Sequence, residues 1–122
     1  MSKVQWLGEP QEHDYPAAEQ YLSLLMSDSM AKNAVTKLHE AKNVEYKAKD
    51  ILRASGLPLL DTSSAHVRHD MEKIERGDAL SPILLVRGSI EGGMHLLIAD
   101  GYHRVCASYW TDENSPIVAR MI

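Results

Sequence analysis

The sequence predicts a small protein of the α+β or α/β class, and two observations lead to that prediction. Residues 1–56 place apolar residues at helical spacing, which is typical of amphipathic helices. Residues 57–122 alternate helical patterns with short continuous apolar runs, which are typical of buried strands. The whole chain has 122 residues, the size of one domain. We therefore expect a single domain, 1–122, with a helical N-terminal subregion (1–56) before a sheet-containing core (57–122).

The N-terminal subregion should begin with a polar arm and continue as three helices. The arm covers residues 1–13, and the expected helices cover residues 16–26, 30–42 and 44–55. Asp14 is a candidate N-cap for the first helix, and Asp28 or Ser29 for the second. Gly56 is expected to end the third helix in a left-handed conformation, ahead of Pro58.

The C-terminal core should contain a hairpin, two helices and a closing strand. Residues 57–60 indicate a short strand or an extended loop, and residues 64–76 a helix that Thr62, Ser63 or Ser64 caps and Gly77 ends. Two apolar runs joined by a glycine-containing connection predict the hairpin. The expected hairpin strands are residues 83–86 and 94–99, followed by a helix at 102–110 and a strand at 117–122.

Composition and charge narrow the function classes. The net charge is −4 and the pI is about 5.8, so DNA contact is not expected, because DNA-binding domains usually carry a basic excess. The single cysteine, Cys106, favours a reducing compartment. The sequence shows neither a signal peptide nor an apolar run long enough to span a membrane, so a cytoplasmic location is expected. Six histidines are present, but no metal-binding motif accompanies them, and no metal site is predicted.

The turn Asp100-Gly101-Tyr102-His103-Arg104, called here the 100–104 turn, is the expected functional centre. It follows an apolar run and opens a helix, whose first N–H groups lack partners and attract anions. His103 and Arg104 place positive charge where the helix dipole disfavours it, and a bound phosphate or carboxylate would compensate for that charge. Alternatively, Asp100 pairs with Arg104 and the segment is only a turn. Asp100 itself is either a group that orients His103 or binds Mg²⁺, or a helix cap.

Longer segments around this turn resemble the ParB/sulfiredoxin superfamily. The resemblance rests on Ser81-Pro82-Ile83-Leu84-Leu85-Val86 and on Leu96-Leu97-Ile98-Ala99-Asp100-Gly101-Tyr102-His103-Arg104-Val105-Cys106-Ala107. A helix and glycine before the first segment, and Ser115-Pro116-Ile117-Val118-Ala119 after the second, extend it to about residues 57–122. It implies a small mixed sheet of the ParB N-terminal type.

The resemblance also implies a nucleotide site at the 100–104 turn. Superfamily members bind ATP, as in sulfiredoxins and ParB-like free serine kinases, or CTP, as in chromosome-partitioning ParB proteins. By resemblance, His103 and Arg104 would contact nucleotide phosphates and the backbone of Gly101 and Tyr102 would line them. The preceding helix would add contacts, for which the nearest candidates are His66, His69 and Lys73.

Two departures limit the resemblance. Sulfiredoxins have a reactive cysteine immediately before the His-Arg pair, where this chain has Tyr102, so sulfiredoxin chemistry is not expected. Partitioning proteins carry a Gly-Glu-Arg-Arg type motif and a following helix-turn-helix domain, where this chain has Gly-Tyr-His-Arg and stops at Ile122, so a full partitioning protein is not expected.

Three functions therefore compete. The first is a nucleotide-binding regulatory module. The second is an ATP-dependent phosphotransferase that acts on a small molecule, with Asp100 as its candidate catalytic residue and Mg²⁺ as an assisting ion. The third is a DNA-associated or fold-only protein that binds no nucleotide. ATP or another nucleotide is the expected cofactor, and a homodimer is left open.

Overall fold

A mixed four-stranded sheet forms the centre of the molecule. The computed structural model describes residues 3–122. Its central sheet has the strand order β2-β6-β4-β5, in which β4 pairs antiparallel with β5 and parallel with β6, and β6 pairs antiparallel with β2. These strands are Asn43–Lys47 (β2), Ile83–Val86 (β4), Leu97–Asp100 (β5) and Pro116–Met121 (β6). The mixed α+β class expected from the sequence is confirmed.

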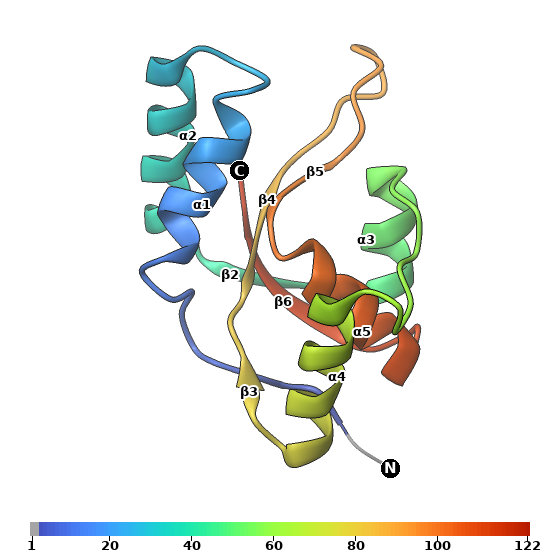
Figure 1. Cartoon of the computed structure of the whole chain (residues 1–122). Coiled ribbons are helices and arrows are strands. Elements are labelled where there is room, and N and C mark those ends of the chain that lie inside the picture. The colour runs from blue at the N-terminus through green and yellow to red at the C-terminus, as the bar shows by residue number, and fades with distance from the viewer. Residues whose placement is uncertain (1–2) are drawn as a thin grey trace.

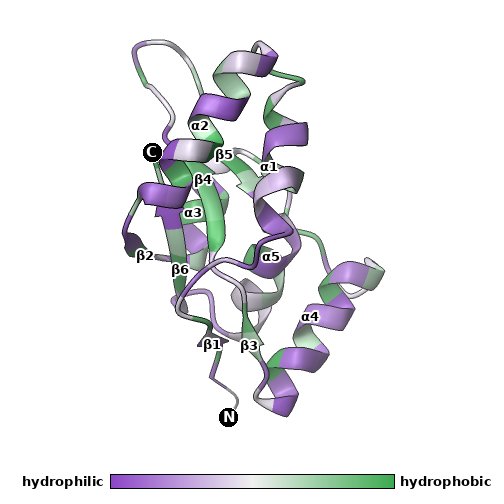
Figure 2. Cartoon of the chain, turned by 90° about the vertical axis from the view of Figure 1, so that its left-hand side faces the viewer, coloured by the Kyte–Doolittle hydropathy of each residue, from purple (hydrophilic) through white to green (hydrophobic). Residues whose placement is uncertain are grey.

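Helices cover both faces of this sheet (Figure 1). Alternate residues of β4 face opposite ways, so Leu84 packs against α1 and α2, whereas Ile83 and Leu85 pack against α3 and α5. In Figure 2, β4 is apolar along its length, as expected for a strand buried on both faces. The covering helices are Asp14–Leu22 (α1), Asp28–Glu40 (α2), Ala48–Ser55 (α3) and Tyr102–Thr111 (α5).

A third layer lies at one end of the sheet, beside the 100–104 turn. Helix α4 (Ala65–Arg76) packs against α5, with Val67 and Ile74 buried beside Cys106 and Ala107. Under it, β1 (Gln5–Trp6) and β3 (Ala79–Leu80) form a separate two-stranded parallel pair. None of the helices in residues 3–122 is long and apolar enough to cross a membrane.

The sequence predicted a helical N-terminal subregion, but the structure shows that this subregion also contains the strands β1 and β2. The predicted helix 44–55 is a strand followed by a helix, because residues 43–47 pair with β6 and only Ala48–Ser55 is helical. The expected arm 1–13 contains β1, and the Trp6 Nε1 donates to the carbonyl of Pro116 (3.2 Å). Residues 57–60 are an extended loop, one of the two predicted alternatives.

Most of the predicted helix caps agree with the structure, and two of them differ. Ser64 caps α4, and Gly56 and Gly77 end α3 and α4 in left-handed conformations, as predicted. Asp14 is not an N-cap, since it lies inside α1 and is buried. The cap of α2 is Ser27, whose hydroxyl accepts from the Met30 N–H (3.2 Å).

Candidate functional site

The 100–104 turn joins β5 to α5, as the sequence predicted, and Gly101 makes the turn possible. Gly101 has a φ of 112°, and an added Cβ would lie 2.3 Å from the Cγ2 of Ile83. Glycine is therefore required by backbone conformation and by the close approach of β4. The space beside its Cα is filled by Ile83 and leaves no room for a ligand on that side.

Arg104 turns inward and is engaged by protein groups. Its Nη2 donates to the Asp100 carboxylate (2.6 Å), and its Nη1 donates to the carbonyl of Ser81 (2.6 Å). Its side chain is only 13% exposed. The sequence left open whether Arg104 meets a ligand or pairs with Asp100, and the geometry shows the pairing with Asp100.

A second carboxylate, from α1, completes this buried cluster. Asp14 lies 3.7 Å from the Arg104 Nη1, and its carboxylate also accepts from the Ser81 hydroxyl and the Gln11 N–H. The cluster of Asp14, Ser81, Asp100 and Arg104, called here the arginine cluster, thus ties α1, β5, α5 and the residue before Pro82 together. Ser81 was not predicted as a site residue, and Asp14 was predicted only as a helix cap.

Burial raises the pKa of Asp100 to about 6, against the opposing effect of Arg104. The neighbouring carboxylate of Asp14 adds to that rise, since two acids beside a single guanidinium repel each other when both are ionised. Asp100 was predicted as the catalytic residue, but its carboxylate is already bound to Arg104. Structurally, Asp100 holds the arginine and does not orient His103.

His103 lies on the outer side of the same turn and meets a residue of α4. Its ring centroid is 4.7 Å from that of His66, with the planes inclined by 34°. Burial lowers the pKa of His103, and the neighbouring His66 lowers it further. Two of the residues expected to contact phosphate are therefore brought together from separate helices.

The first turn of α5 has no side-chain cap among the described residues. Gly101 is the N-cap residue, and no side chain of residues 3–122 caps the helix by a hydrogen bond. The N–H groups of a first helical turn lack carbonyl partners within the helix, and they carry a partial positive charge. The paired histidines therefore stand at an uncapped helix N-terminus, which attracts anions.

Helix α4 contributes a stripe of polar residues to this outer side. His66, Asp70 and Lys73 follow at spacings of four and three, so they share one face of the helix. Burial raises the pKa of Asp70, against the opposing effects of Arg104, Lys73, His69 and His103. We call His66, Asp70, Lys73 and His103 the histidine cluster.

The remaining predicted residues take other positions. His69 is exposed on α4 and lies about 60° around the helix from His66, away from the buried Val67 and Ile74, so it does not join the histidine pair. Tyr102 donates its hydroxyl hydrogen to the carbonyl of Pro58 (2.5 Å), and its ring centroid lies 5.6 Å from that of His103. Cys106 is fully buried in the apolar core between α4 and α5.

Within residues 3–122, no group of three or more His, Cys, Asp or Glu side chains is arranged to hold a metal ion. Comparison with protein-family models, curated proteins and solved structures found no significant match to this chain.

Proposed function

We propose that this protein binds a phosphate group of a nucleotide at the uncapped N-terminus of α5, in a regulatory or binding role. The observation that carries the proposal is the pairing of His66 with His103 at that helix end, with ring centroids 4.7 Å apart. An anion beside the pair, at the edges of the two rings, would accept hydrogen bonds from the imidazoles and from the first-turn N–H groups. The resemblance to the ParB/sulfiredoxin superfamily supports a nucleotide as the source of that anion.

Electrostatics favour an anion on the outer side of the turn. The helix dipole, Lys73 and any protonated imidazole are positive, and Asp70 is the one carboxylate of the histidine cluster. The lowered pKa of His103 means that its protonated form is penalised in the free protein by burial and by His66. A phosphate would reduce that penalty, and by linkage its binding would strengthen as pH falls.

In this proposal the phosphate contacts His66 and His103, and it does not contact Arg104. Arg104 is a positioning residue in the proposal, because its guanidinium is bound to Asp100 and Ser81. It holds the turn so that His103 and the first N–H groups face outward. Sulfiredoxin chemistry is not part of the proposal, because Tyr102 stands at the position of the reactive cysteine.

Binding is proposed ahead of phosphotransfer, because Asp100 is held by Arg104 and is not free to act as a base. The carboxyl oxygens at the site also fit a resident Mg²⁺ poorly, since Asp100 is paired and Asp70 faces cations. Mg²⁺ would therefore arrive with the nucleotide.

A thermal-shift titration with ATP, ADP, CTP and GTP, each with and without Mg²⁺, tests the proposal. A ligand that binds only the folded state raises the unfolding midpoint. We expect a rise with at least one nucleotide, its loss in His103→Ala and in His66→Ala, and its retention in His69→Ala, the matched control on the same helix. No rise at millimolar nucleotide, or an undiminished rise in both histidine variants, would contradict the proposal.

A further inference from the structure

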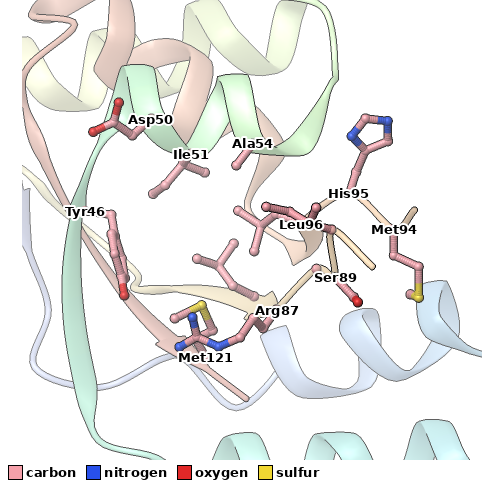
Figure 3. Close-up of a pocket in the computed structure, with 13 residues that line it drawn as sticks. Tyr46, Asp50, Ile51, Ala54, Arg87, Ser89, Met94, His95, Leu96 and Met121 are labelled. Carbon is pink, nitrogen blue, oxygen red and sulfur yellow. The ribbon is translucent and has the colours of Figure 1, made fainter. Parts of the chain in front are cut away.

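A concave site lies at the opposite end of β5 from the 100–104 turn. A pocket of about 450 Å³ opens where β4 ends and β5 begins, between α3 and the β4–β5 hairpin. Figure 3 shows side chains from α3, both hairpin arms, β2 and β6 around it. Its volume falls within the range of about 300–1,000 Å³ that is typical of small-molecule sites.

The walls of the pocket are held by backbone contacts. The Leu96 N–H donates to the Ala54 carbonyl (3.0 Å), which ties the start of β5 to α3. The hairpin arms approach so closely at Gly88 that an added Cβ would lie 2.6 Å from the Met94 carbonyl oxygen. Ser89 and Met94 also exchange two backbone hydrogen bonds across the arms, of 2.8 and 2.9 Å. The cavity is therefore a built feature of the fold and not a gap beside a loose loop.

The lining is mainly apolar and contains one guanidinium. Apolar side chains make up most of the wall, among them Ile51, Ala54, Leu85, Leu96 and Met121. Arg87 is exposed on the pocket, and no carboxylate of residues 3–122 forms a salt bridge with it. In Figure 3 the Arg87 guanidinium and the Tyr46 ring lie on one side of the pocket, and His95 lies on the other.

From this arrangement we infer that the pocket binds a small organic monocarboxylate with an apolar body. The guanidinium of Arg87 would receive the carboxylate in a two-pronged hydrogen bond, and the apolar wall would cover the rest of the molecule. Asp50 also lines the pocket, on α3, and would repel the anionic end from that side. A single cation suits a monocarboxylate better than a polyphosphate, so this site is independent of the proposed nucleotide site.

Octanoate is a suitable probe, with 1-octanol as a neutral ligand of the same chain length. Titrations of the whole protein, followed by the backbone amide NMR signals of Leu96 and Met121, give the dissociation constant for each. We expect octanoate to bind up to about fivefold more tightly than 1-octanol, which is the discrimination that an exposed ion pair supplies. Arg87→Gln should remove that difference, whereas Arg76→Gln, a control on an exposed arginine of α4 that does not line the pocket, should preserve it.

A pocket-filling variant tests the same site without altering charge. Ala54→Phe places a large side chain in the cavity, and it should abolish the octanoate-induced shifts at Leu96 and Met121. Equal affinity for octanoate and 1-octanol in the wild-type protein would overturn the inference. Undiminished binding in either Arg87→Gln or Ala54→Phe would overturn it as well.

Discussion

The two sides of the 100–104 turn differ in how their charges are satisfied. On the inner side, the arginine cluster surrounds one guanidinium with two carboxylates and a carbonyl, and the Arg104 side chain is 13% exposed. On the outer side, the histidine cluster brings two imidazoles and Lys73 to a helix N-terminus, opposed by a single carboxylate. His103 and Arg104 are adjacent in sequence, yet one belongs to each cluster.

This difference separates a charge that is bound by protein groups from one that is open to an added anion. A buried arginine that is saturated by protein acceptors holds elements together and has little capacity left for a ligand. A half-buried histidine whose neighbours disfavour its protonated form gains from an added anion. Burial and hydrogen-bond partners thus distinguish two basic residues that are adjacent in the sequence.

Removal of Arg104 should produce the largest effect. Arg104→Ala leaves Asp14 and Asp100 buried without their cation, and loss of one partner of a buried pair costs about 3–5 kcal/mol. We expect a loss of about 3 kcal/mol in the free energy of unfolding at pH 8, measured by urea denaturation. The loss should be smaller at pH 5, where Asp100 is protonated more readily.

An exposed arginine provides the control for this variant. Arg76 pairs with Asp78 at 3.1 Å, with its side chain 54% exposed, and Arg76→Ala should cost less than about 1 kcal/mol. If Arg104→Ala cost no more than Arg76→Ala, the arginine cluster would not be the structural centre of the turn.

The arginine cluster should also make the free energy of unfolding depend on pH. This effect should be smaller than that of Arg104→Ala. The pKa of Asp100 is raised in the folded protein from 3.8 to about 6, so ionisation of this group is harder in the folded than in the unfolded chain. Its contribution to stability is therefore greatest below pH 4 and declines as pH rises to about 6. Between pH 4 and pH 7 the wild type should lose about 2 kcal/mol relative to Asp100→Asn.

Urea denaturation of both proteins across this pH range measures that difference. Comparison of the two cancels the contributions of the other carboxylates, which the proteins share. A relative change of the opposite sign would mean that Arg104 stabilises the ionised Asp100 more than burial disfavours it.

Local features of the fold were predictable from sequence because they depend on neighbouring residues. Ser64, Gly56 and Gly77 act at helix ends through their own side chain or backbone freedom. The apolar run at β4 identifies a buried strand without any knowledge of its partners.

Strand β2 was missed because its pattern imitates a helix. Val44, Ala48 and Ile51 follow at spacings of four and three, which is the helical repeat, although Val44 belongs to a strand. The strand exists because it pairs with β6, more than 60 residues later in the chain, and no local pattern encodes that pairing.

Several residues of the two clusters were predicted from the sequence, among them His66, Lys73, His103 and Arg104. Ser81 and the geometry of the clusters were not predicted. Which of them meet depends on the packing of α4 against α5, and the inward turn of Arg104 depends on Asp14 from the distant helix α1. Such long-range contacts decide which charge faces a ligand.

The most direct test of the central claim is the pKa of His103, measured by NMR of the histidine ring C–H signals with and without inorganic pyrophosphate. We expect pyrophosphate to raise the pKa of His103 and to shift the His66 signal, because a bound anion stabilises the protonated imidazole, while the exposed His69 signal stays in place. An unchanged pKa of His103 at saturating pyrophosphate, or equal shifts at His69 and His103, would contradict the account.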